Sequence, residues 1–271
     1  MIKKSVLCLS LLCLALSTPL AANVQGPAKG GDPAKPAAEA FPDKRPEIEK
    51  LLATLEANVN KRGAADTDAV GVIDQLLQEF PKSGPKDRVA IAKGLSKCFE
   101  SRRLEKQGEP LDNKLYLAAA VALGRMGPES TPVLIAWIGQ KDLRKDLKLQ
   151  HELILSLGKT KDKAAIKTLL LTLENKDAPL VSAGAEAIGE FSAADLETRK
   201  QLFEALLKQL MSAKGAMDSD PNNSTARERY DVIAAPIITS LSKLSKHDER
   251  DPAEWQRWWN KNKKGDWEAG G

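Results

Sequence analysis

The chain of 271 residues contains few aromatic residues and only two histidines. Phe, Trp and Tyr make up 4% of the sequence, whereas the hydrophobic residues together make up 42%. An apolar content that is mainly aliphatic suits the thin cores between packed helices. Neither His151 nor His247 stands at a spacing typical of a zinc site.

The common signatures of catalytic and cofactor sites are also missing. The sequence has no phosphate-binding Gly-Lys-Ser/Thr loop, no Gly-x-Ser-x-Gly nucleophile elbow and no dinucleotide fingerprint. We therefore predict no catalytic, metal-binding or cofactor-binding residue, and we expect a protein that is not an enzyme.

The N-terminal apolar stretch, residues 6–16, is too short to span a bilayer. It follows Lys3 and Lys4 and precedes a run of small residues that ends at Ala22, which is the arrangement of a secretory signal peptide. We predict that residues 1–22 are a cleaved leader and that the protein is periplasmic or secreted. No transmembrane helix is expected after cleavage.

Loss of this leader changes both the cysteine content and the charge. Cys8 and Cys13 leave with it, so Cys98 cannot form an internal disulfide, and we expect a small buried residue there. The formal net charge falls from +4 to +2 when Lys3 and Lys4 are removed. Such a mixed surface argues against nucleic acid as a partner.

A short phrase recurs in the middle of the chain and predicts the fold. Its closing residues, Gly124, Gly158 and Gly189, are 34 and then 31 residues apart. A repeat of this period is typical of stacked helix pairs. The three copies span residues 119–124, 153–158 and 184–189, and weaker copies span 91–96 and 237–242.

Small residues in this phrase predict close contact between neighbouring helices. The closing glycine predicts the end of the first helix of each pair, because glycine adopts the left-handed conformation of a helix cap at little cost. We expect the helices to begin at Pro46, after a disordered tether over residues 23–45 that is rich in Pro, Ala, Gly and Lys.

Two irregularities follow the clear repeats. Residues 212–225 contain Gly215 and a cluster of Asp, Pro and Asn, which predicts a long exposed loop. Pro236 then falls within a helical pattern and should kink or restart that helix.

The repeats resemble HEAT repeats, in particular the short type of the phycobilisome-lyase-like arrays. The resemblance covers residues 66–245 and is carried best by residues 113–139, 146–173 and 177–189. The C-terminal Trp255, Trp258 and Trp259 are similar to a Trp-x-x-Trp-Trp tail of exported bacterial HEAT-like proteins. The resemblance implies an all-α, right-handed α-solenoid over residues 46–247, with its clear repeats at about 113–211.

The three tryptophans share one helical face, because they stand at positions i, i+3 and i+4. We expect the segment 248–271 to fold back and shield the last repeat. The alternative is a platform on which sugars stack.

Basic residues suggest a second possible surface. They form two groups, which would make one cationic ridge from Lys141 to Lys167 if the turns of successive repeats stacked. The candidates for interaction are these basic residues and one histidine that lies between the two groups: Lys141, Arg144, Lys145, Lys148, His151, Lys159, Lys161 and Lys163.

The sequence thus predicts an exported, non-catalytic HEAT-type scaffold that binds another protein of the cell envelope or the exterior through its concave helical surface. The first alternative is a module that binds an anionic polymer, such as a polysaccharide, through the Lys141–Lys167 ridge. The second alternative, implied by the family resemblance alone, is a lyase-like enzyme.

Overall fold

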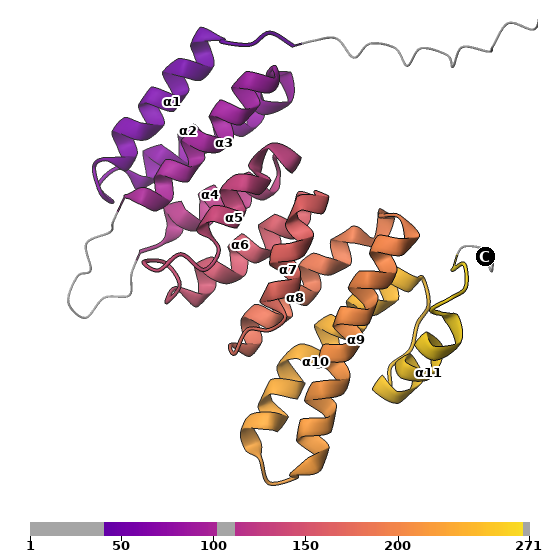
Figure 1. Ribbon diagram of the computed structural model, residues 1–271. Helices are drawn as coiled ribbons and strands as arrows, with labels where there is room; N and C mark the ends of the chain where they lie inside the picture. The colour runs from indigo at the N-terminus through magenta and orange to yellow at the C-terminus, as the bar shows by residue number, and fades with distance from the viewer. Residues whose placement is uncertain (1–40, 102–111, 268–271) are drawn as a thin grey trace, which may run out of the picture. The chain divides into compact units, whose positions relative to one another are not determined.

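The computed structural model describes residues 41–101 and 112–267, and this part of the chain is built from eleven α-helices without a strand. The predicted leader, residues 1–22, and residues 23–40 of the predicted tether lie outside the described residues. The helices are labelled in Figure 1. They are α1 (Pro46–Val59), α2 (Asp66–Glu79), α3 (Pro85–Glu100), α4 (Lys114–Gly124), α5 (Thr131–Trp137), α6 (Leu147–Lys159), α7 (Ile166–Thr172), α8 (Ala178–Gly189), α9 (Leu196–Ser219), α10 (Ser224–Ser245) and α11 (Pro252–Asn262).

The even-numbered helices pack against one another in sequence order. Helix α2 contacts α4, α4 contacts α6, α6 contacts α8, and α8 contacts α10. Each odd-numbered helix from α3 to α9 packs against a member of this row, and α1 contacts α3. This packing agrees with the predicted pairs of helices. None of the described helices is both long and apolar enough to cross a membrane.

The repeated glycines lie where neighbouring helices of this row approach most closely. A Cβ atom built on Gly124 would lie 2.9 Å from the Cα of Ser156, and one on Gly158 would lie 2.5 Å from the Cα of Ala187. A Cβ on Gly189 would lie 2.7 Å from the hydroxyl of Ser240. At Gly124 and Gly158 any side chain would push the two helices apart, because the atoms in the way include backbone atoms. At Gly189 a side chain would have to displace the Ser240 hydroxyl group.

Our explanation of these glycines as left-handed caps was wrong. Among the described glycines only Gly63, Gly127 and Gly139 have a positive φ. Gly189 has a φ of −60°, and the last helical turn of α8 is right-handed there. Close approach, and not cap geometry, explains the recurring glycine.

The two weak copies of the phrase have different positions in the fold. Ser240 of the last copy meets Gly189, so residues 237–242 continue the row in register. Residues 91–96 belong to α3, which packs against α1, α4 and α5 and not within the row of even-numbered helices. The assignment of the first weak copy was wrong because α2, which has no closing glycine, occupies that place in the row.

The predicted loop over residues 212–225 was also wrong. Helices α9 and α10 run side by side as a hairpin (Figure 1), and only residues 220–223 connect them. Helix α9 continues through Gly215, where Lys214 forms an ion pair with Asp218 one turn later, at 2.5 Å. Contact with α10 thus outweighs the low helix propensity of this segment.

Helix α10 likewise runs through Pro236 without a restart. Proline removes the hydrogen bond to the carbonyl group of Val232. Val232 is exposed, so water can satisfy that carbonyl group.

The end of the predicted tether is held against the first turn of α3. The carboxylate of Asp87 accepts hydrogen bonds from the backbone N–H groups of Lys44 and Arg45, at 2.8 and 3.1 Å. Asp43 in turn accepts a hydrogen bond from the N–H of Lys86, at 2.8 Å. The predicted tether therefore cannot extend to residue 45.

Candidate binding site

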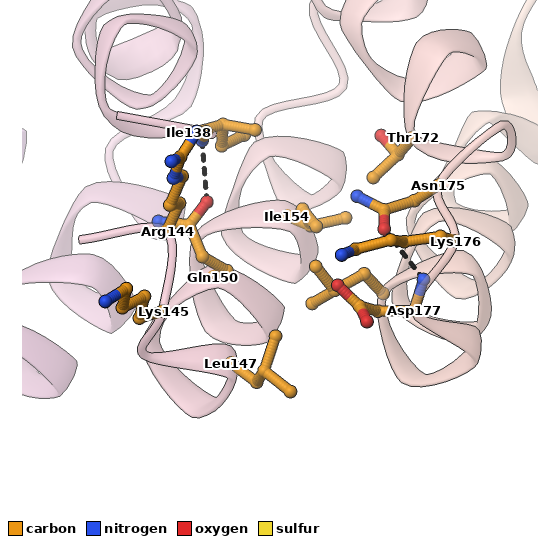
Figure 2. Close-up of a pocket in the computed structure, with 12 residues that line it drawn as sticks. Ile138, Arg144, Lys145, Leu147, Gln150, Ile154, Thr172, Asn175, Lys176 and Asp177 are labelled. Atoms are coloured by element: carbon orange, nitrogen blue, oxygen red, sulfur yellow. Dashed lines mark hydrogen bonds between the residues drawn. The ribbon is translucent and has the colours of Figure 1, made fainter. Parts of the chain in front are cut away.

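A groove of about 780 Å³ lies between two turns that lead into successive helices of the row. We call it the turn groove. One wall is the turn between α5 and α6 with the start of α6, and the other is the turn between α7 and α8 (Figure 2). Its volume is within the range of about 300–1,000 Å³ that is usual for ligand-binding clefts.

Gln150 fixes the first wall. Its side chain is buried, its Oε1 accepts a hydrogen bond from the N–H of Gly139 at 2.7 Å, and its Nε2 donates to the carbonyl group of Trp137 at 3.4 Å. Gly139 has a φ of +75°, a conformation that costs other residues about 1–2 kcal/mol. The turn is thus tied to the helix that follows it.

Asp146 fixes the start of α6. Its Oδ1 accepts a hydrogen bond from the N–H of Leu149 at 3.0 Å, which caps the helix. Its Oδ2 accepts a second one from Asn113, the residue before α4, at 2.8 Å. The turn therefore has a fixed position relative to the preceding repeat.

The second wall is held from α10. The guanidinium group of Arg229 donates to the carbonyl groups of Asn175 and Lys176, at 2.9 and 2.8 Å. The side chain of Asn175 accepts a hydrogen bond from the N–H of Asp177, at 2.9 Å. Since neither wall can move without losing such bonds, the groove exists before any ligand binds.

The groove combines an apolar surface with charged side chains. Figure 2 shows Ile154 between the two walls, with Leu147 at the lower edge of the first. Arg144 lies beside Ile138 on the first wall, and Lys176 extends from the second wall into the space between them. The remaining charged residues in the lining are Lys145 and Asp177.

The predicted basic residues do not form one ridge. Lys141, Arg144, Lys145 and Lys148 lie at the start of α6, whereas Lys159, Lys161 and Lys163 lie at or beyond its end. About 16 Å of helix separates Lys148 from Lys159. The ridge from Lys141 to Lys167 was a wrong prediction, because the two groups belong to turns on opposite ends of the helix.

The second group is engaged in ion pairs. Lys159 lies 3.7 Å from Glu152, Lys161 lies 3.7 Å from Glu190, and Lys163 lies 2.7 Å from Asp195. The hydrogen bond from Lys163 holds the pKa of Asp195 well below its usual range, and bonds from Thr198 add to the effect. Lys161 and Lys163 thus join neighbouring repeats, whereas the pair of Lys159 with Glu152 lies within α6.

His151 is half-buried on α6 and is not part of the groove lining. Cys98 is buried, as expected. No group of three or more metal-ligating side chains in residues 41–101 and 112–267 could hold a metal ion.

The C-terminal tryptophans pack on the side chain of Phe203 in α9. The ring centroids of Trp255, Trp258 and Trp259 lie 5.6, 5.3 and 5.1 Å from that of Phe203. Trp255 is fully buried and Trp259 nearly so. Trp258 is half-buried and stacks on the ring of His247, with ring centroids 5.1 Å apart. The three rings therefore pack against the protein and do not form an open platform for sugars.

Asn175, Lys176 and Asp177 line the groove but were not among the predicted residues. They lie in the turn before α8, which corresponds to the turn before α6 in the preceding repeat. Comparing these two corresponding turns would have identified them.

No protein-family model matches the chain, and no curated protein or solved structure matches it.

Proposed function

We propose that this protein is an exported, non-catalytic scaffold that binds another protein through the turn groove and the neighbouring surface of its helical repeats. We further propose that the helix pairs form a right-handed α-solenoid of the HEAT type. The row of even-numbered helices, with its repeated glycine contacts, supports this architecture. The proposal of export rests on the N-terminal sequence.

The observation that carries the binding function is the chemistry of the turn groove. Its walls are fixed by the hydrogen bond that Gln150 accepts from Gly139 and by those that Arg229 donates. Apolar side chains line it beside Arg144 and Lys176. An apolar surface with a few fixed charges suits a protein segment, because such a segment offers both apolar and polar side chains. A preformed groove also lowers the entropic cost of binding.

Affinity capture with the purified protein from an envelope extract of its own host tests this function. Bound proteins are identified by mass spectrometry at low and at moderate salt. We expect to recover a protein partner that remains bound at moderate salt. Recovery of nothing beyond what a column without the protein retains would overturn the proposal.

Binding of an anionic polymer remains the second candidate, now through the first basic group alone. Lys141, Arg144, Lys145 and Lys148 form no ion pair with any described residue. A polyanion would be released steeply as salt increases, because its binding depends on counterion release. Recovery of only such a polymer, lost at moderate salt, would favour this candidate.

A further inference from the structure

The turns at the two ends of the helix pairs differ in whether their cationic side chains form ion pairs. At the turns within pairs, cations of one repeat are paired with carboxylates of the next. Arg88 lies 3.5 Å from Glu129, and Lys163 lies 2.7 Å from Asp195. Such pairs leave little net charge for a partner to recognise.

At the turns between pairs, the cations of the turn groove have no such partner. Arg144, Lys145 and Lys176 are exposed, and none forms an ion pair with a described residue. Asp146 is next to Lys145 in the chain, but its oxygens accept the hydrogen bonds that cap α6 and bind Asn113. The groove lining therefore contains three cations and one carboxylate, that of Asp177.

From this geometry we infer that the turn groove binds an extended acidic peptide segment in which an aliphatic residue stands next to Asp or Glu. This inference rests on the proposed function and names the class of partner. The carboxylate of the segment accepts hydrogen bonds from the guanidinium group of Arg144, which can bind both oxygens. The ammonium group of Lys176 attracts a carboxylate from the opposite wall.

The aliphatic residue of the segment covers the apolar surface between these cations. Leu147 is 42% exposed and Ile138 is half-buried, whereas Ile154 between the walls is already buried, so it is Leu147 and Ile138 that gain from contact with a Leu or Ile side chain. Asp177 repels the carboxylates of the segment and so weakens its binding. A polyanion without apolar groups would leave this surface in water.

A peptide array tests the inference. End-blocked peptides of randomised sequence are probed with the purified full-length protein, and the best peptide is then titrated by fluorescence anisotropy. We expect enrichment of Asp or Glu beside Leu, Ile or Val, and loss of binding when Asn and Gln replace the acidic residues.

Variants of the groove sharpen the test. Arg144→Ala and Lys176→Ala should each weaken binding of that peptide about five- to tenfold, as expected for loss of one charge-assisted hydrogen bond at a partly exposed site. Asp177→Asn should strengthen it about two- to threefold, since it removes a like charge. Lys167→Ala removes one exposed cation outside the groove and is the matched control, which should bind as the original protein does.

Enrichment of other peptides, or an equal effect of Lys167→Ala and Arg144→Ala, would overturn the inference. Heparin binding that all three lysine and arginine variants weaken equally would also overturn it, in favour of a non-specific polyanion. Suppose that affinity capture still recovers a protein that dissociates from Arg144→Ala and Lys176→Ala no faster than from the original protein. In that case the scaffold function stands and only this assignment of the groove fails.

Discussion

Replacement of Gly158 by alanine should destabilise the fold although alanine favours helices. Gly158 lies in the last turn of α6, and the new Cβ would be 2.5 Å from the Cα and 2.7 Å from the carbonyl oxygen of Ala187 in α8. Ordinary contacts between such atoms begin near 3.5 Å, so the two helices must separate by about 1 Å. The atoms in contact are backbone atoms, which cannot move aside as a flexible side chain can.

The expected magnitude follows from two opposing effects. Inserting a methyl group into a packed contact costs about 1–3 kcal/mol. Replacing glycine by alanine within a helix returns about 0.5–1 kcal/mol. We therefore expect the free energy of unfolding of Gly158→Ala to fall by about 1–2 kcal/mol.

Gly215→Ala is the matched control. Gly215 lies within α9, and a Cβ atom there would have no neighbour within 4 Å. The same substitution should raise the free energy of unfolding by about 0.5–1 kcal/mol. Urea titrations followed by far-UV circular dichroism measure both values, with thermal unfolding as a check on cooperativity.

The opposite signs of the two effects make the test decisive. If Gly158→Ala stabilised the protein as much as Gly215→Ala does, the contact between α6 and α8 would not depend on glycine. The explanation of the repeated phrase by close approach would then be refuted.

Three further predictions concern other parts of the fold. Trp255→Ala should lower the free energy of unfolding by about 3–5 kcal/mol, as measured in urea, because this buried ring fills the contact between α11 and α9. The ion pair of Asp195 with Lys163 should stabilise the protein at pH values above the unfolded pKa of about 3.9, and this contribution should disappear as the pH falls through the lower pKa of the folded state. The urea midpoint should therefore fall more steeply between about pH 5 and pH 3 in the original protein than in Asp195→Asn. Gln150→Ala should cost about 0.5–1.5 kcal/mol, because the N–H of the exposed Gly139 exchanges its side-chain acceptor for water, and hydrogen exchange at that N–H should become faster.

Each of these predictions has a clear contrary outcome. An unchanged urea midpoint for Trp255→Ala would mean that α11 does not contribute to the stability of the remaining helices. Parallel pH profiles of the original protein and Asp195→Asn would exclude a contribution from that ion pair. Unchanged exchange at Gly139 would show that Gln150 does not hold the first wall.

The sequence predicted the helices because its apolar residues recur with helical periodicity. Leu115, Leu149 and Leu180, which share one position of the repeat, are all buried. The start of the first helix at Pro46 was also correct. These features depend on local spacing and are therefore visible in the chain itself.

The role of the glycines could not be predicted, because cap geometry and close approach select the same residue. Only the backbone angles, such as the φ of −60° at Gly189, distinguish the two. Residues 212–219 were mistaken for a loop for a related reason, since their low helix propensity is overcome by packing of α9 against α10.

The turn groove required the tertiary structure. The sequence identified Arg144 and Lys145 but linked them to the wrong lysines, because it did not show that α6 separates the two basic groups. Lys176, more than thirty residues from Arg144, comes to the groove only through the packing of α6 against α8. Arg229 on α10, which donates a hydrogen bond to the backbone carbonyl group of Lys176, is farther still along the chain.

Site-specific photo-crosslinking in the organism that naturally produces the protein tests the central claim most directly. A photoreactive amino acid replaces Leu147, which lines the turn groove, or Leu171, which is 59% exposed on α7 and is not part of the groove lining. If the groove binds a protein, irradiation should produce a defined protein adduct from position 147 and not from position 171. No adduct from either position, or the same adducts from both, would contradict a protein-binding scaffold that acts through this groove.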